Sequence, residues 1–362
     1  MKSSNSYAII MAGGGGERFW PMSRMRTPKQ LLALVSKRTL IEETVARIEP
    51  LFSRRNILVI TNSQQAQKIG ALLPQLPRRN IIAEPMRRDT AAAVALAATI
   101  VGERDPSATM AVLPADHVIR EPERYRQVLS DCLALAQREK ALVTIGIHPH
   151  EPNTGYGYIE VGARKTTGTR TNFFRARRFV EKPDLSTAKR YLASGKYRWN
   201  AGMFVWSFEA IREGLQRHMP EVTAQIARLR PWVDTARFGS ALRKIYPGLP
   251  RISIDFGLME KASNVVVADG KFAWDDVGSW VALENHLPRG TEGNVARGRL
   301  MTLRSHNNII IGNKKLIATL GVRDLIIVQT DDATLVCHRD EAQKIKELVA
   351  ALARGPRFRR HL

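Results

Sequence analysis

The segment Tyr7-Ala-Ile-Ile-Met-Ala-Gly-Gly-Gly-Gly-Glu-Arg, residues 7–18, decides how this chain folds. Its first five residues form an apolar run typical of a buried strand, and four glycines follow almost at once. Glycines placed after a strand let the backbone approach a phosphate and turn successive N–H groups toward it. The segment therefore predicts a strand that ends in an anion-binding loop. It lacks the Gly-Lys-Ser/Thr of a Walker loop and does not match the dinucleotide fingerprint cleanly.

Outward from this segment, the first part of the chain alternates apolar, strand-like runs with stretches of helical spacing. Such alternation predicts an α/β fold in which helices cover both faces of a parallel sheet, with ligands at the carboxyl ends of the strands. The expected strands are 7–11, 56–61, 80–83, 109–113 and 141–145, and the expected helices are 38–51, 64–73, 89–104 and 122–140.

The pattern changes from residue 153 onward. A plausible linker at 286–293 precedes a β-rich stretch, 294–336, and an amphipathic closing helix, 341–353. We expect two domains, residues 1–287 and residues 293–362. Before the linker, the expected strands are 156–161, 179–183 and 200–206, and the expected helices are 208–218, 220–229 and 235–245. The Arg-rich stretch up to 178 is expected to form a hairpin or loop.

Composition narrows the function classes. The 56 Lys and Arg residues exceed the 34 Asp and Glu residues, giving a net charge of +22 and pointing to polyanionic partners, among them nucleic acid, membrane surfaces and phosphorylated small molecules. No nucleic-acid motif accompanies the charge. No apolar run reaches the roughly 18 residues that cross a bilayer, and no signal peptide precedes the first strand. The two cysteines exclude a disulfide framework. From these observations together, we expect a soluble, cytoplasmic protein without nucleic-acid or membrane partners.

Two cations follow the glycine run at a distance that suits a shared anion. Arg18 ends the quoted segment, and Lys29 lies in Pro28-Lys-Gln, one loop later. Lone Arg and Lys residues are usually solvated surface charges, but their position after a strand and a glycine loop favours a functional interpretation. The segments that carry further chemistry are Glu84-Pro-Met-Arg-Arg-Asp-Thr-Ala, Pro114-Ala-Asp-His, Phe179-Val-Glu-Lys-Pro, Trp199-Asn-Ala-Gly-Met-Phe-Val-Trp and Asp276-Val-Gly-Ser-Trp.

Together and in this order, these segments resemble the signature of the sugar-phosphate nucleotidyltransferases, and most closely that of the mannose-1-phosphate guanylyltransferases. The resemblance is strong over residues 7–285 and weaker in the tail. It implies a Rossmann-like core with a mixed, mainly parallel sheet, plus a small β-rich, β-helix-like C-terminal module. It also implies the transfer of GMP from GTP to mannose 1-phosphate with release of pyrophosphate, assisted by Mg²⁺. The tail implies a monofunctional enzyme without a cupin domain and, by analogy, a homodimer.

The same resemblance implies roles for individual residues. Arg18, Lys29 and Lys182 are the expected catalytic cations, with Lys182 on the phosphate of the incoming sugar. Asp116 and Asp276 are the expected Mg²⁺ ligands, since this ion takes one or two carboxylates plus phosphate oxygens and water; the alternative for each is a helix cap or a turn. The remaining expected contacts are Gly157, Glu181 and Asn200 for the sugar phosphate, and Ala12, Gly13, Gly14, Gly15, Gly16, Glu84, Asp89, Thr90, Pro114, Ala115 and Asp116 for the nucleotide.

Glu84 is our candidate for reading the base. Guanine presents two donors, N1–H and the 2-amino group, and one carboxylate can accept both. Glu84 stands at the end of an expected strand, although a solvated loop carboxylate is an equal alternative. Two other functions stay open at this point: a nucleotidyltransferase for another sugar 1-phosphate or nucleotide, and a catalytically silent sugar-nucleotide sensor.

Overall fold

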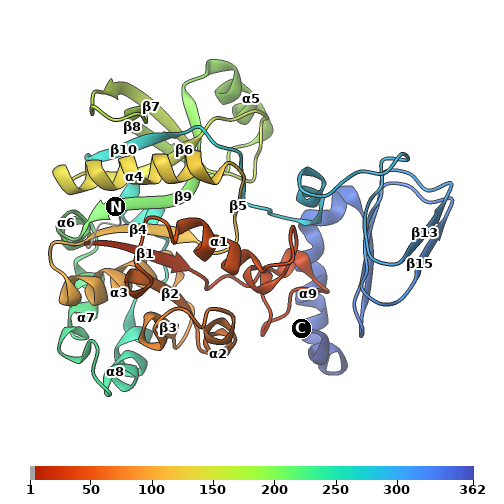
Figure 1. The fold of residues 1–362 in the computed structure, drawn as a ribbon, viewed down its shortest axis with the longest axis horizontal. Coiled ribbons are helices and arrows are strands. Elements are labelled where there is room, and N and C mark those ends of the chain that lie inside the picture. The colour runs from red at the N-terminus through yellow and green to blue at the C-terminus, as the bar shows by residue number, and fades with distance from the viewer. Residues whose placement is uncertain (1–4) are drawn as a thin grey trace. The chain divides into compact units, whose positions relative to one another are not determined.

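The computed structural model describes residues 5–362, and its contacts divide the chain into two compact units (Figure 1). Within residues 5–362, no helix is long and apolar enough to cross a membrane. Each unit has its own apolar core and is described by itself. Unit 1 comprises the chain up to Gly13, Val45–Ala115 and Ile119–Trp274, and unit 2 comprises Gly14–Thr44, Asp116–Val118 and Asp275–Leu362.

Unit 1 contains a nine-stranded sheet with the strand order β3-β2-β1-β4-β9-β6-β10-β8-β7. The pairs β3–β2, β2–β1, β1–β4 and β6–β10 are parallel, whereas β9 runs antiparallel to β4 and β6. The sheet is therefore mixed, with its N-terminal strands parallel. The strands are β1 (Ser6–Met11), β2 (Ile57–Asn62), β3 (Ile81–Glu84), β4 (Thr109–Pro114), β6 (Leu142–Ile147), β7 (Tyr158–Lys165), β8 (Phe173–Val180), β9 (Tyr197–Ser207) and β10 (Val265–Gly270).

The central strands are buried on both faces, which explains their continuous apolar sequence. Ser6–Ile10 of β1 and Ile57–Thr61 of β2 are all buried. Alternate residues such as Tyr7 and Ile9 join one large cluster with the buried residues of α3 and α6. The helix α4 contacts β4, β6, β9 and β10, yet none of its residues belongs to that cluster, so it covers the opposite face.

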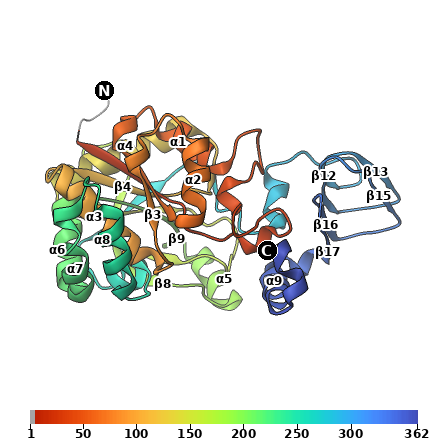
Figure 2. The ribbon, with the colours of Figure 1, turned by 90° about the horizontal axis from the view of Figure 1, so that it is seen from below.

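Several helices begin at a residue that suits a helix N-terminus. Asn62 and Ser207 accept from the backbone N–H groups of Gln65 and Ala210, and Pro122 opens α4 at its first turn. Figure 2 shows α3, α6, α7 and α8 grouped together. The helices are α1 (Leu40–Ile48), α2 (Ser63–Leu72), α3 (Asp89–Arg104), α4 (Pro122–Arg138), α5 (Leu185–Ser194), α6 (Phe208–His218), α7 (Pro220–Ala227), α8 (Phe238–Ile245) and α9 (Ile345–Arg354).

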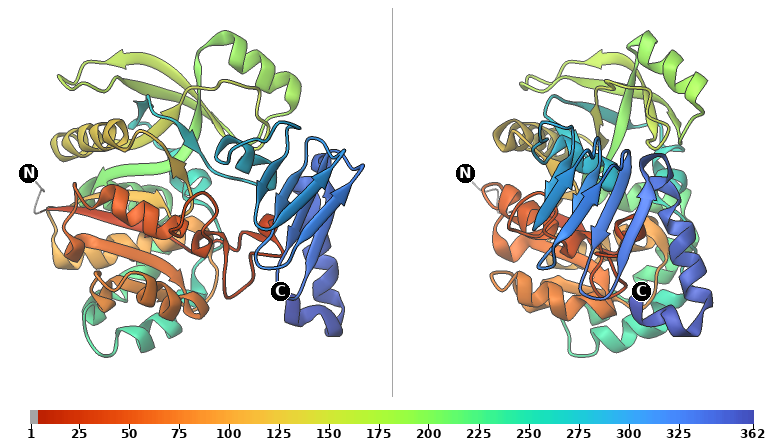
Figure 3. Two further views of the ribbon diagram at one scale, coloured as in Figure 1. Left: turned by 45° about the vertical axis from the view of Figure 1, so that its right-hand side comes forward. Right: turned by 90° about the vertical axis from the view of Figure 1, so that its right-hand side faces the viewer.

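Unit 2 combines the loop 14–44 with a C-terminal coil of short strands, drawn in blue in Figure 3. The chain alternates between a four-stranded sheet, β12-β14-β16-β17, and a two-stranded one, β13-β15. All pairs except β16–β17 are parallel, which is the pattern of a β-helix-like coil. The strands are β12 (Val295–Arg297), β13 (Leu300–Leu303), β14 (Ile309–Ile311), β15 (Ile317–Leu320), β16 (Leu325–Gln329) and β17 (Thr334–His338).

The fold class expected from the sequence is confirmed, and the expected domain limits differ from the compact units. Residues 14–44 and 275–287 fall within the expected first domain, but Phe19, Trp20 and Trp280 pack in one apolar cluster with Ile309 and Ile326 of the C-terminal strands. Shared core residues therefore assign these loops to unit 2. The element predictions were also inexact in places: β8 ends at Val180, the closing helix begins only at Ile345 after a 3-10 segment, and neither β10 nor α5 was expected.

Candidate active site

The glycine loop is held in its conformation by the segment around Lys29. Gly16 has a φ of 63°, and a Cβ there would lie 2.4 Å from the Cβ of Lys29 and 2.8 Å from its backbone nitrogen. The amide of Gln30 donates to the Gly14 carbonyl at 3.2 Å. Because no side chain fits at position 16, only glycine lets the loop approach Lys29 this closely. The loop and Pro28-Lys-Gln, which the sequence linked only by spacing, are packed together.

Lys29 connects the two expected metal ligands. Its ammonium donates to Oδ2 of Asp116 at 2.8 Å and to the backbone carbonyl of Asp276. The Lys29 side chain is 7% exposed, whereas that of Asp116 is 32% exposed. Burial by itself would raise the pKa of Asp116, but the charges of Lys29 and His117 outweigh it and hold the pKa below its ordinary value. Asp116 is therefore ionised, and its carboxylate is open on one side.

These residues line a single cavity of about 380 Å³ within unit 2. Within residues 5–362 the buried Nε of Arg18 has no hydrogen-bond partner, which leaves it as a donor available to an anion. Six lining residues were not among the expected site residues: Glu17, Phe19, His117, Val277 and Gly278 lie within two residues of expected ones, and Lys346 lies in the distant closing helix. The lining comprises Gly15, Gly16, Glu17, Arg18, Phe19, Lys29, Asp116, His117, Asp276, Val277, Gly278 and Lys346.

The donor set of this cavity fits a hard divalent cation that also binds phosphate. Asp116 and Asp276 both line it, and within residues 5–362 no group of three or more His, Cys, Asp or Glu side chains is assembled for a metal. Two carboxylates alone are too few for a closed structural site, but they match Mg²⁺, which completes its shell with substrate phosphates and water. The surrounding cations suit the same phosphates.

The expected nucleotide contacts in unit 1 lie at the carboxyl ends of neighbouring parallel strands. Ala12 and Gly13 follow β1, Glu84 ends β3, and Ala115 follows β4, donating its N–H to the Met11 carbonyl. At this edge, open α/β sheets bind their ligands. Asp89 and Thr90 begin α3, and the Thr90 hydroxyl accepts from the backbone N–H of Ile254 at 2.8 Å.

Glu84 is buried and paired, which sequence reasoning did not anticipate. Tyr246, 162 residues further on, donates its hydroxyl to Oε1 of Glu84. The other oxygen, Oε2, lies 3.4 Å from the position that a Cβ on Gly13 would take. Burial raises the pKa of Glu84 to about 7, although the Tyr246 hydrogen bond opposes the rise. A carboxylate has about four acceptor positions, so Glu84 retains acceptor capacity beside the glycine loop.

The expected sugar-phosphate residues lie together in unit 1. A Cβ on Gly157 would be 2.7 Å from Oε2 of Glu181 and 3.7 Å from the Cβ of Asn200. The Asn200 N–H donates to the Gly157 carbonyl at 2.8 Å, and Lys182 donates to Oε1 of Glu181 at 2.6 Å. Lys182 has a φ of 41°, an uncommon value for a residue other than glycine, and its side chain is exposed.

Asp255 completes this group and was missed from the sequence. It accepts from the amide of Asn200 at 2.7 Å. Burial, followed by the charges of Glu181 and Asp89, raises the pKa of Asp255 above its ordinary value. A carboxylate that orients a half-buried amide in this way positions the amide for hydroxyl recognition. The only sequence signal was a single acidic residue in the apolar stretch 252–259, which does not distinguish a ligand from a helix cap.

Comparison with known proteins gives consistent matches over the chain. The nucleotidyl transferase family model matches residues 7–291, and the MannoseP isomerase/GMP-like beta-helix domain matches residues 298–352. The mannose-1-phosphate guanylyltransferase of Escherichia coli K12 is 36% identical, covering 96% of this chain and 74% of its own. The xanthan biosynthesis protein XanB of Xanthomonas campestris is 37% identical, covering 96% and 73%. A crystal structure from Thermus thermophilus, described as mannose-1-phosphate geranyltransferase, superposes with a TM-score of 0.84 and 36% identity, covering 96% of this chain and 99% of that one.

Proposed function

Because the chain belongs to the mannose-1-phosphate guanylyltransferase family of nucleotidyl transferases, we propose that it transfers GMP from GTP to mannose 1-phosphate and releases pyrophosphate. The observation that carries the proposal is the cavity in which Arg18 and Lys29 surround Asp116 and Asp276 beside the glycine loop. A triphosphate requires this combination of cations, backbone N–H groups and metal-binding carboxylates.

The chemistry needs positioning and charge neutralisation rather than a covalent intermediate. An oxygen of the sugar phosphate attacks the α-phosphorus of GTP in line, and pyrophosphate leaves. Lys29, fixed by Asp116 and by the Asp276 carbonyl, presents a preorganised positive charge that offsets the charge of the departing pyrophosphate. Arg18 offers its unpartnered Nε to the same phosphates.

Asp116 and Asp276 are the residues that would hold Mg²⁺. When bound, the ion would withdraw charge from the phosphate oxygens during the transfer. The ionised state of Asp116, maintained by Lys29 and His117, keeps that ligand ready at neutral pH.

Substrate recognition is proposed for the residues of unit 1. Glu84 accepts from the donor edge of guanine, and the ordered Asn200 amide, together with Glu181 and the backbone at Gly157, binds the hexose hydroxyls. Lys182 binds the phosphate of the sugar, for which it leaves its contact with Glu181. The hydrogen bond from Asn200 to Asp255 supports this assignment because it fixes the positions of the donor nitrogen and the acceptor oxygen of the amide.

A matrix of nucleoside triphosphates against hexose 1-phosphates, with pyrophosphate release as the readout, tests the proposal. We expect the highest kcat/KM for GTP with mannose 1-phosphate. A higher kcat/KM for another pair would show that the protein catalyses the same type of reaction with other substrates. Tight binding of GDP-mannose without turnover of any pair would instead favour the sugar-nucleotide sensor.

A further inference from the structure

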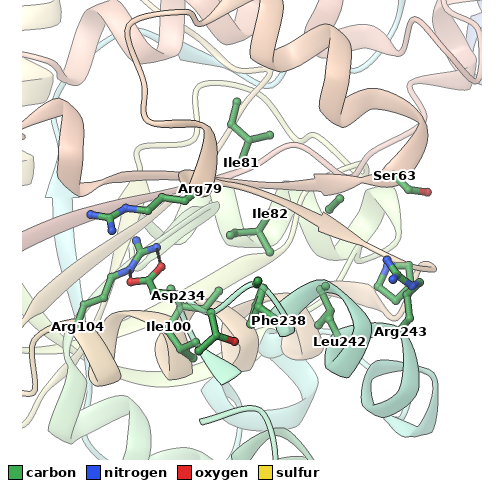
Figure 4. Close-up of a pocket in the computed structure, with 16 residues that line it drawn as sticks. Ser63, Arg79, Ile81, Ile82, Ile100, Arg104, Asp234, Phe238, Leu242 and Arg243 are labelled. Atoms are coloured by element: carbon green, nitrogen blue, oxygen red, sulfur yellow. Dashed lines mark hydrogen bonds and ion pairs between the residues drawn. The ribbon is translucent and has the colours of Figure 1, made fainter. Parts of the chain in front are cut away.

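A second cavity, of about 660 Å³, lies in unit 1 along β3, the edge strand of the nine-stranded sheet (Figure 4). Its walls come from β3, the end of α3 and the segment 233–243, which includes most of α8. None of its lining residues belongs to the cavity that contains Lys29. The volume falls in the range of roughly 300–1,000 Å³ that small-molecule sites occupy.

The middle of this cavity is apolar. Figure 4 shows Ile82, Ile100, Phe238 and Leu242 gathered between its two ends. Ile82 and Leu242 are only 6% and 3% exposed, so they form a fixed floor rather than mobile surface side chains. Apolar walls of this kind gain free energy by covering an apolar ligand.

The two ends of the cavity are cationic but differ in how the charge is balanced. At one end, Arg104 donates Nε and Nη2 to the two carboxylate oxygens of Asp234, at 2.9 and 2.7 Å, and Arg79 also interacts with this carboxylate. Arg243 lies at the other end (Figure 4), and within residues 5–362 Arg243 forms no ion pair. The lining thus holds three arginines and one aspartate, an excess of two positive charges, and Arg243 is the arginine at the end away from that aspartate.

We propose that this cavity binds an organic anion with an apolar body, its anionic group at Arg243 and its apolar part between β3 and α8. A guanidinium offers several donors to a carboxylate, sulfonate or phosphate, and an apolar wall beside it selects against small inorganic anions. The proposal does not depend on the substrates of the transferase reaction.

The probe that tests this is 8-anilinonaphthalene-1-sulfonate, whose aromatic rings and sulfonate match the two features of the cavity. Fluorescence titration of the full chain, with stoichiometry from equilibrium dialysis, should give one saturable site. The Arg243→Gln variant removes one charge-assisted contact, and we expect its Kd to rise about tenfold or more. Arg243 is exposed, so this change leaves the core intact.

The Gly239→Leu variant fills the cavity itself. A Cβ at Gly239 meets only Nη1 of Arg243, at 3.7 Å, so a larger side chain enters open space. We expect this variant to melt like the wild type and to lose the site. The matched control is Arg212→Gln, which neutralises an exposed arginine on α6 outside the cavity. Unchanged binding by Gly239→Leu, or equal weakening by Arg243→Gln and Arg212→Gln, would place the probe elsewhere and overturn the proposal.

Discussion

Replacing Gly16 by alanine tests whether the glycine loop positions Lys29, the proposed catalytic lysine. Two independent costs follow from the structure. The φ of 63° places an alanine in the left-handed region, at a cost of roughly 1–2 kcal/mol. The added Cβ would also lie 2.4 Å from the Cβ of Lys29 and 2.8 Å from its backbone nitrogen, so the backbone must shift, at a further cost of roughly 1–3 kcal/mol.

Two matched glycines separate these costs. Gly168 has nearly the same φ, 67°, but a Cβ there would meet nothing within 4 Å, so Gly168→Ala measures the conformational cost alone. Gly14 lies in the same loop, has open space around it and no positive φ. Gly14→Ala therefore measures the effect of adding a methyl group to the loop without the conformational cost or the steric cost. We expect the Tm to fall by on the order of 5 °C for Gly16→Ala, by about half as much for Gly168→Ala, and hardly at all for Gly14→Ala.

The activity of the same variants reports on Lys29. A shift of the Lys29 backbone disturbs its contacts with Asp116 and the Asp276 carbonyl, so kcat/KM for Gly16→Ala should fall tenfold or more, equivalent to about 1.4 kcal/mol. Gly168→Ala should keep the wild-type kcat/KM. If Gly16→Ala melts no lower than Gly168→Ala and retains full activity, the close packing of the loop on Lys29 does not position the lysine.

Three further predictions concern the base, the metal and the sugar. Burial gives Glu84 a folded-state pKa of about 7 against an ordinary 4.5, so its protonated form stabilises the fold at low pH, and this stabilisation is lost as the pH rises through about 7. The Tm of the wild type minus that of Glu84→Gln should therefore fall between pH 5 and pH 8. A Tm difference that stays constant over this range would contradict the burial argument. The wild-type preference for GTP over ATP in kcat/KM should rise over the same pH range and stay flat in Glu84→Gln, unless backbone groups read the base. Asp116→Asn and Asp276→Asn should each lower kcat about a hundredfold and raise the Mg²⁺ requirement, with a double variant hardly worse than the worse single one; additive losses with unaltered Mg²⁺ dependence would exclude a shared ion. Asn200→Ala should raise the KM for mannose 1-phosphate at least tenfold while leaving the KM for GTP within twofold, and an equal effect on both substrates would indicate a structural role.

The sequence predicts the parts of the fold that depend on local patterns. An apolar run predicted β1 to within one residue, and helical spacing predicted α3 and α6 with their observed limits. The end of β8 was misjudged because Phe179-Val-Glu-Lys-Pro has a strand-like start and a proline that stops the ladder. The compact units could not be predicted, because the core shared by residues 14–44 and the C-terminal strands joins segments far apart in the chain.

For the candidate site too, the sequence located some residues and missed others. Family-like segments located Arg18, Lys29, Asp116 and Asp276, and the structure shows that they line one cavity. Tyr246 was not predicted, because its contact with Glu84 spans 162 residues and nothing near either residue signals it. Asp255 was missed for the same reason, since its partner Asn200 lies 55 residues earlier. Sequence patterns indicated which residue types the chemistry needs, whereas the contacts that orient those residues depend on the tertiary structure.

The most direct test of the proposed reaction follows the phosphorus atoms themselves. A ³¹P NMR time course of the wild-type protein with GTP, mannose 1-phosphate and Mg²⁺ should show GDP-mannose and pyrophosphate forming in equal amounts. The Lys29→Gln variant, which lacks the charge beside Asp116, should form both products at least a hundredfold more slowly, on the order of 3 kcal/mol of lost transition-state stabilisation. Absence of GDP-mannose with the wild type, or equal rates for both proteins, would contradict the account.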